Sequence, residues 1–125
     1  KKLTPLVGGG APWTADAALP GGDFKVSARD QLFADLQADY PFLDDRWALR
    51  LIKGYGTEAR VILGDAKSAG DLGQDFGATL TEAEVKWLMA KEYAVSADDV
   101  VWRRSKLGLR LRPDQIAALD AFMAA

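Results

Sequence analysis

Five cationic side chains lie close together near the C-terminal end of the chain: Arg103, Arg104, Lys106, Arg110 and Arg112. Guanidinium groups bind phosphate and carboxylate groups through paired N–H donors, so such a cluster could hold an anion. The alternative is a solvated or ion-paired surface, because Asp98, Asp99 and Asp114 supply counter-charges nearby. Arg103, Arg104 and Lys106 are therefore candidates for either a structural or an anion-contact role.

The same region also resembles a helix-turn-helix DNA-binding motif. Residues 82–106 would form a helix, a short turn and a second helix that carries WRRSK. However, Asp98 and Asp99 occupy the first turn of the second helix, where they would repel phosphates. A net charge of -2 and a pI of about 5.1 also provide no long-range attraction. We therefore expect no nucleic-acid partner, and keep a DNA-binding or helical protein-interaction module as the alternative.

Other chemistry is poorly represented in the sequence. The chain has no cysteine and no histidine, so it lacks disulfides, the usual general base and the commonest metal ligand. Asp65, Asp71 and Asp75 lie in a glycine-rich stretch but miss the ligand spacing of a calcium-binding EF-hand. The glycines at 8–10 do not follow a strand, so they do not form a phosphate-binding loop. We expect no catalytic, cofactor-binding or metal-binding residue on this chain.

Two of the four tryptophans are candidates for contacts with another domain. Trp13 lies in a segment too rich in proline and glycine to bury it locally. Trp87 lies off the main apolar stripe of its helix. Because tryptophans are more often core or interface residues than ligand platforms, we assign Trp13 and Trp87 to a domain interface.

Two central helices within residues 80–109 must position the cationic cluster. Thr81 and Glu84 have the spacing of a capping box, in which each side chain bonds the backbone N–H of the other residue. Ser96 and Asp99 repeat this spacing at the start of the second helix. Both helix starts are therefore well specified by the sequence.

Apolar residues at helical spacing predict which helix faces are buried. Val85, Leu88 and Met89 form the stripe of the first central helix. In the helix that Asp44 can cap, the apolar stripe leaves three cationic residues largely outside it: Arg46, Arg50 and Lys53. We therefore expect Met89 to be buried and these three cations to face solvent.

Further helices are expected over 27–40, 44–56 and 58–63, and from Pro113 onward. No strand longer than a few residues is expected. A chain of 125 residues with 49% hydrophobic and 27% charged residues suits one globular domain. The sequence thus predicts an all-α fold, a small orthogonal bundle of five or six helices.

Proline and glycine delimit the remaining segments. Residues 1–24 should form an extended arm or linker, followed by a helical domain over 25–125. Residues 64–77 should form a long ordered loop, held to the helices by Leu72 and Phe76.

Short motifs occur in one order along nearly the whole chain: PWT at 12–14, LPGG at 19–22, YP at 40–41, Arg50 with YG at 55–56, DLG at 71–73, FG at 76–77, Glu82 with Glu84, and DD at 98–99 with WRRSKLG at 102–108. Each motif is short, but the series is specific. It resembles the C-terminal cap domain of the FAD-dependent, aerobic glycerol-3-phosphate dehydrogenases and the related alpha-glycerophosphate oxidases.

The resemblance implies a fragment of a larger enzyme whose missing part binds FAD and glycerol 3-phosphate. That parent oxidises glycerol 3-phosphate to dihydroxyacetone phosphate and passes electrons to a membrane quinone or, in the oxidases, to oxygen. We favour quinone because PWTADAALPGG and WRRSKLGL are closer to the bacterial dehydrogenases. The fragment would be a non-catalytic cap without its own cofactor, its partner being the flavin-binding domain of the same chain, and the parent could form a homo-oligomer.

No apolar run approaches the roughly 20 residues of a membrane-spanning helix, so we expect no direct membrane insertion by this chain. The expected location is cytoplasmic, with the parent bound peripherally to the inner face of the cell membrane.

Arg103 and Arg104 match a recurring arginine pair of the resembled family. Our hypothesis is that they bond carbonyls or carboxylates of the chain itself and hold the second central helix against the loop at 64–77.

Overall fold

The computed structural model describes residues 14, 15 and 17–125, and these form a mainly helical structure. The α-helices are α2 (Arg29–Asp39), α3 (Asp45–Tyr55), α4 (Ala59–Leu63), α5 (Glu82–Lys91) and α6 (Pro113–Met123). Shorter elements are the 3-10 turns η1 (Val26–Ala28), η2 (Gly56–Glu58), η3 (Ala69–Leu72) and η5 (Leu107–Leu109), and the π-helix η4 (Asp99–Arg104). Strands β1 (Asp75–Gly77) and β2 (Leu80–Thr81) form an antiparallel hairpin. The predicted helical class is confirmed.

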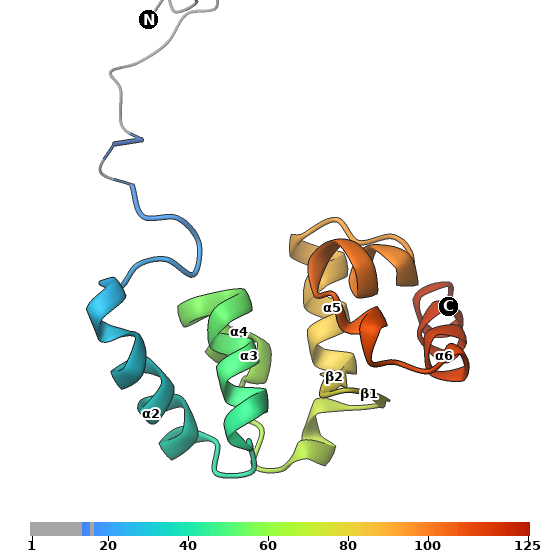
Figure 1. The fold of residues 1–125 in the computed structure, drawn as a ribbon, viewed down its shortest axis with the longest axis horizontal. Helices are drawn as coiled ribbons and strands as arrows, with labels where there is room; N and C mark the ends of the chain where they lie inside the picture. Colours follow the sequence, from blue (N-terminus) through green and yellow to red (C-terminus); the bar gives the residue numbers. More distant parts are fainter. Residues whose placement is uncertain (1–13, 16) are drawn as a thin grey trace, which may run out of the picture.

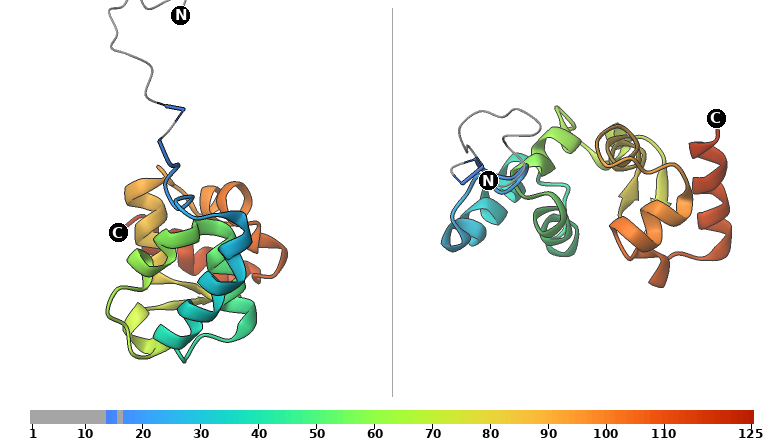
Figure 2. Two further views of the ribbon diagram at one scale, coloured as in Figure 1. Left: turned by 90° about the vertical axis from the view of Figure 1, so that its left-hand side faces the viewer. Right: turned by 90° about the horizontal axis from the view of Figure 1, so that it is seen from above.

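The elements are arranged as two adjoining groups of helices (Figures 1 and 2). One group contains α2, α3 and α4, and the other contains the hairpin, α5, η4 and α6. Helix α4 packs against α5 and joins the groups. The largest fully buried apolar side chains come from both groups: Leu36, Leu51, Phe76, Leu80, Val85, Leu88, Val100, Val101 and Leu119. One hydrophobic core therefore runs through both groups.

Helix α3 buries the predicted apolar stripe, and α2 forms close to its predicted range with one difference at its start. The side chain of Asp44 accepts a hydrogen bond from the Trp47 backbone N–H at 2.7 Å, so the predicted cap of α3 is confirmed. The helix expected from residue 27 begins at Arg29 instead, because Ser27 lies within η1 and Ala28 occupies the N-cap position without a side-chain bond. The two helices are joined by the turn that contains Pro41.

The segment before η1 docks onto the end of α3. The Gly22 N–H bonds the Leu19 carbonyl at 2.8 Å, which closes a turn. Within this turn the Gly21 carbonyl accepts a bond from the Thr57 N–H at 3.3 Å. Gly56 has a φ of +55°, and a Cβ there would lie 1.8 Å from the Gly21 oxygen. The LPGG motif at 19–22 and the YG motif at 55–56 thus contact each other through their backbones.

The glycine-rich segment between α4 and α5 is ordered, and both predicted anchors are confirmed. Leu72 and Phe76 are 3% and 2% exposed, and the ring of Phe76 lies 5.3 Å from that of Phe122. The sequence analysis did not identify the hairpin that follows. Its turn contains Ala78 and Thr79, both with positive φ, 49° and 68°. Two positive φ angles are typical of the tight turns that match strand twist, although glycine or asparagine usually occupies them.

The predicted capping box at the start of α5 is wrong. Thr81 occupies the N-cap position, but its side chain makes no capping bond. Glu84 instead points inward and is 1% exposed. Met89, expected in the core, is 37% exposed, whereas Val85 and Leu88 are fully buried. The buried face of α5 is therefore rotated toward Glu84.

The second capping box is confirmed, but the helix it begins is unusual. The Ser96 N–H bonds the Asp99 carboxylate at 3.1 Å, and the Asp99 N–H bonds the Ser96 hydroxyl at 3.4 Å. The following η4 is π-helical, and the Ser105 N–H bonds the carbonyl five residues earlier, that of Val100. Lys106 then adopts a left-handed conformation and turns the chain into η5.

In the described part of the chain, no helix combines the length and apolar character needed to cross a bilayer. The expected boundary at residue 24 stays a prediction.

Candidate functional site

A buried ionic cluster connects the two groups of helices. The guanidinium of Arg50 binds both carboxylate oxygens of Glu84, each at 2.6 Å. Arg50 also donates to the hydroxyl and to the carbonyl oxygen of Thr79, at 2.8 and 2.7 Å. The Tyr55 hydroxyl donates to Glu84 at 2.7 Å. The cluster therefore links α3, the hairpin turn and the first turn of α5.

The hydrogen bonds and opposite charges within this cluster offset the loss of hydration of its buried groups. A buried ion pair is favourable only when good geometry and further hydrogen bonds offset the loss of hydration, and here the pairing is bidentate. Burial raises the pKa of Tyr55 well above its usual range, and the negative charge of Glu84 acts in the same direction. Burial alone would lower the pKa of Arg50, but its hydrogen bond and charge interaction with Glu84 raise it overall. Both residues are held in their ordinary protonation states.

The sequence analysis placed Arg50 outside the buried face, and the structure corrects this. Its side chain is only 18% exposed. Helical spacing describes the apolar stripe of α3, but it cannot show that a carboxylate 34 residues away covers the adjacent face. Arg50, Tyr55 and Glu84 do appear together among the ordered motifs, and that was the sequence feature that could have identified the cluster.

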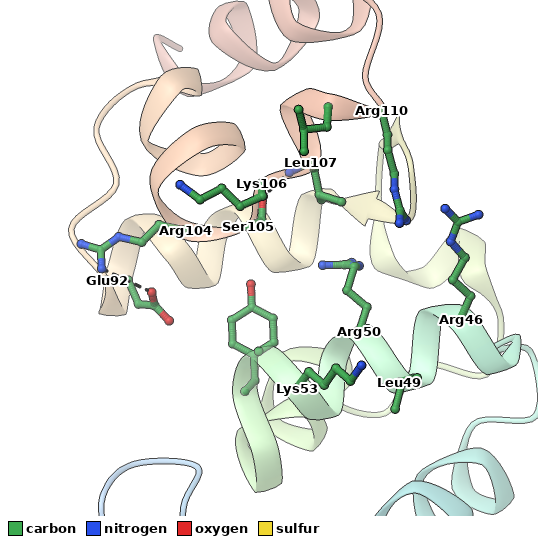
Figure 3. A pocket seen from close by; sticks show the side chains of 13 residues that line it. Arg46, Leu49, Arg50, Lys53, Glu92, Arg104, Ser105, Lys106, Leu107 and Arg110 are labelled. Carbon is green, nitrogen blue, oxygen red and sulfur yellow. Dashed lines mark hydrogen bonds and ion pairs between the residues drawn. The ribbon is translucent and has the colours of Figure 1, made fainter.

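A cleft of about 550 Å³ lies over this cluster, between α3 and the segment from Arg104 to Arg110 (Figure 3). One carboxylate, that of Glu92, lines the cleft within the described residues. Six cationic side chains also line it: Arg46, Arg50, Lys53, Arg104, Lys106 and Arg110. The cleft therefore has a strongly positive lining, although the whole chain carries a net charge of -2.

The structure separates the three predicted anion-contact residues. Arg104 and Lys106 line the cleft, where Arg104 lies 3.8 Å from Glu92 and the Lys106 amine donates to the Trp102 carbonyl. Arg103 does not line it and pairs with Asp99 on its own helix, with 75% of its side chain exposed. The carboxylates bound by the arginine pair thus lie on η4 and just after α5 rather than in the loop at 64–77. The expected loop contact is replaced by these local ion pairs.

Asp99 organises the turn before η4. Its carboxylate accepts bonds from the Val95 and Ser96 backbone N–H groups, each at 3.1 Å, and from Arg103. The bond from Val95 is the main cause that lowers the pKa of Asp99, which therefore remains ionised at neutral pH. These bonds favour the structural role for Arg103 over the anion-contact role, and that choice stays a prediction.

Trp87 is half-buried and packs against the hydrophobic core, with the Lys91 amine 6.0 Å from its ring centroid. Its assignment to a domain interface stays a prediction. Trp13 lies outside the described residues.

Replacing Tyr55 by phenylalanine is expected to reduce the loss of stability in alkali. An unfolded tyrosine ionises near pH 10.0, whereas Tyr55 in the fold has a higher pKa. The contribution of Tyr55 to the free energy of unfolding is therefore complete below about pH 10, and it is lost progressively as the pH rises toward the folded-state pKa. Near pH 8 the variant should be about 1 to 2 kcal/mol less stable, because Glu84 loses a buried donor.

Urea unfolding of the wild type and Tyr55→Phe at a series of pH values measures this effect. The two stabilities should converge above about pH 10. Parallel curves over the whole range would show that the Tyr55 hydroxyl is not held by Glu84.

The described residues offer no clear site for a metal ion or a flavin cofactor. No three histidine, cysteine, aspartate or glutamate side chains in the part the structure describes lie together in a way that could hold a metal ion. The described strands are a hairpin of three and two residues, which does not lead through a glycine loop into a phosphate-binding helix. The residues present do not fit a flavin nucleotide.

The fold and this site define a helical domain with a buried ion pair, between Arg50 and Glu84, that connects its two groups of helices. A sequence comparison matches residues 12–124 to the C-terminal domain of alpha-glycerophosphate oxidase. The chain belongs to this family, the C-terminal domains of the alpha-glycerophosphate oxidases and aerobic glycerol-3-phosphate dehydrogenases, and the resemblance seen in the sequence is confirmed.

Three relatives illustrate the relationship. The chain is 42% identical over 124 residues to the aerobic glycerol-3-phosphate dehydrogenase of Escherichia coli (strain K12), covering 98% of this chain and 25% of that protein. It is 40% identical over 114 residues to a glycerol-3-phosphate dehydrogenase of Pseudomonas aeruginosa, covering 91% and 22%. It is 33% identical over 118 residues to a D-erythritol 1-phosphate dehydrogenase of Brucella abortus, covering 94% and 23%. The chain spans about a quarter of the length of these relatives.

Proposed function

We propose that this chain is the non-catalytic C-terminal domain of a longer flavoenzyme. The parent oxidises sn-glycerol 3-phosphate to dihydroxyacetone phosphate and passes the electrons to quinone. The observation that carries this proposal is the 42% identity to an aerobic glycerol-3-phosphate dehydrogenase over 98% of the chain.

The buried polar groups favour a structural role over a catalytic one. Arg50 and Glu84 bind each other and their neighbours, and the raised pKa of Tyr55 makes its hydroxyl a poor general base at neutral pH. The cluster joins α3, the hairpin and α5 into one rigid body, which suits a domain that supports another part of the protein. FAD would be held by that other part, because the residues of this chain do not fit it.

The flavin-binding domain of the same chain is the proposed partner. The half-buried ring of Trp87 and Trp13 at the start of the chain are our proposed contacts with it. A parent that reduces quinone would work peripherally at the inner face of the cell membrane, without insertion of this domain, and the parent could form a homo-oligomer.

The substrate can be tested with the purified full-length parent and an artificial electron acceptor. We expect oxidation of glycerol 3-phosphate to be much faster than oxidation of D-erythritol 1-phosphate, the compound in the name of the more distant relative. The isolated chain with added FAD should oxidise neither. Preference for erythritol phosphate would overturn the substrate assignment, and activity of the isolated chain would overturn the non-catalytic role.

A further inference from the structure

Cationic side chains approach the cleft from two separate parts of the chain. Arg46, Arg50 and Lys53 lie at positions i, i+4 and i+7 of α3, so they share one face of that helix. Arg104, Lys106 and Arg110 come from the end of η4 and the turns around η5. In Figure 3 the Arg46 side chain rises from α3 and Arg110 descends from the other side, toward the same space.

Few carboxylates offset this charge. Glu84 neutralises Arg50 from beneath, and Glu92 lies near Arg104. Among the described residues, no carboxylate forms an ion pair with Arg46, Lys53 or Arg110. The chain as a whole, by contrast, has 18 acidic and 16 basic residues. Like charges that converge on one space repel, and an anion bound between them would relieve that repulsion.

Arg50 connects the cleft to the rigid part of the domain. A guanidinium has five N–H donors, and the bonds to Glu84 and Thr79 occupy four of them. Arg50 also lines the cleft, so one N–H donor without a protein partner belongs to a residue of the cleft wall. Its orientation is fixed in advance by the buried ion pair, which lowers the entropic cost of binding.

The cleft also offers apolar surface beside the charge. Leu49, Leu107 and Leu109 belong to its lining, and Leu109 is 78% exposed. The volume of about 550 Å³ falls within the range of small-molecule sites. Arg46 and Arg110 also line an adjoining hollow, where Asp44 and the Arg112 that pairs with Asp114 balance the charge, so the excess of positive charge is confined to the cleft. This combination fits a small organic anion better than a bare ion.

We propose that this cleft binds a soluble organic phosphate. The phosphate lies between Arg46 and Arg110, whose planar guanidinium groups can bind its oxygens in pairs, and above Arg50, which can add a single bond. The carbon part of the ligand lies on Leu49 and Leu109. The site contains no catalytic group and therefore binds the ligand without transforming it. This inference does not depend on the proposed function of the parent.

Binding is tested by isothermal titration of the chain with glycerol 3-phosphate and, as the bare-ion comparison, with inorganic phosphate, which should bind more weakly. We expect saturable binding that weakens as salt is added, and a loss of about tenfold or more in affinity in the double variant Arg46→Ala/Arg110→Ala. The charge-matched control is Lys25→Ala/Arg29→Ala, because these two exposed residues lie just before η1 and at the start of α2, and neither lines the cleft. The control should bind within about twofold of the wild type.

Three results would overturn the proposal. The first is that the wild type shows no saturable binding of glycerol 3-phosphate, or binds it no more tightly than inorganic phosphate. The second is an equal loss in both double variants, which would indicate only a general charge effect. The third is binding to phosphatidylglycerol vesicles without binding to soluble phosphates, which would assign the surface to lipid headgroups. Thermal unfolding of each variant checks that the fold is retained, and Arg46→Lys/Arg110→Lys provides a second variant that keeps the charge.

Discussion

Replacement of Glu84 by alanine is expected to lower the free energy of unfolding of the domain by about 3 kcal/mol. Glu84 is 1% exposed and accepts bonds from Arg50 and Tyr55. Its removal leaves a buried cation without a counter-charge and a buried hydroxyl without an acceptor. Removing one partner of a buried ion pair usually costs about 3 to 5 kcal/mol. We expect a loss at the lower end of this range because the Arg50 side chain is 18% exposed. Urea denaturation followed by circular dichroism measures it.

Two further variants distinguish the buried cluster from ordinary surface charge. Asp30→Ala removes an ion pair in which Asp30 is 88% exposed, and its effect should lie close to the error of the measurement. The double variant Arg50→Met/Glu84→Leu should recover part of the stability lost in Glu84→Ala, because no unpaired charge remains. If Glu84→Ala were no more harmful than Asp30→Ala, the cluster would not hold the two groups of helices together.

The second large effect is expected at Gly56. Substitution by alanine requires a left-handed φ and places a Cβ 1.8 Å from the Gly21 carbonyl oxygen, so the backbone of the docked turn must move. We expect a loss of about 2 to 4 kcal/mol in the free energy of unfolding. Limited proteolysis should also cut near the LPGG turn, because its contact with α3 is broken.

Gly54 provides the matched control, two residues earlier. It lies inside α3, and an added Cβ meets nothing within 4 Å. Gly54→Ala should therefore stabilise the domain by about 0.5 to 1 kcal/mol, since alanine loses less conformational freedom in a helix. Equal effects of the two substitutions would contradict the docking of the turn.

Local features of the sequence predicted the helices well. Asp44 and the Ser96 with Asp99 pair specify helix starts through bonds within four residues, and such bonds depend little on the rest of the fold. Leu72 and Phe76 were identified as anchors because large apolar groups in a polar loop have no stable place except the core. The family motifs identified the domain itself.

Contacts between distant segments explain what could not be predicted. Glu84 has the correct spacing for a capping box, but in the fold its carboxylate is buried against Arg50 and Tyr55 instead. The hairpin turn at Ala78 and Thr79 lacks the usual glycine, and Arg50 bonds to Thr79 support its unusual conformation. Only the folded arrangement brings these groups together.

Only part of the candidate site could be predicted, because its residues come from distant segments of the chain. Arg104 and Lys106 were recognised from their local charge density, and both line the cleft. Arg46, Arg50 and Lys53 were assigned to a solvent-facing side of α3, since helical spacing alone cannot show that the residues around η5 face that side. The π-helix also has no simple sequence pattern, although its wider turn sets the direction of the chain into η5.

The most direct test of the structural role compares the flavin content and glycerol 3-phosphate oxidation of the full-length parent with those of a parent that lacks residues 25–125. We predict that the truncated protein fails to retain flavin and is inactive with an artificial electron acceptor. A truncated protein that stays folded, flavin-loaded and fully active would contradict this account and assign the domain to contacts with another partner or with the membrane.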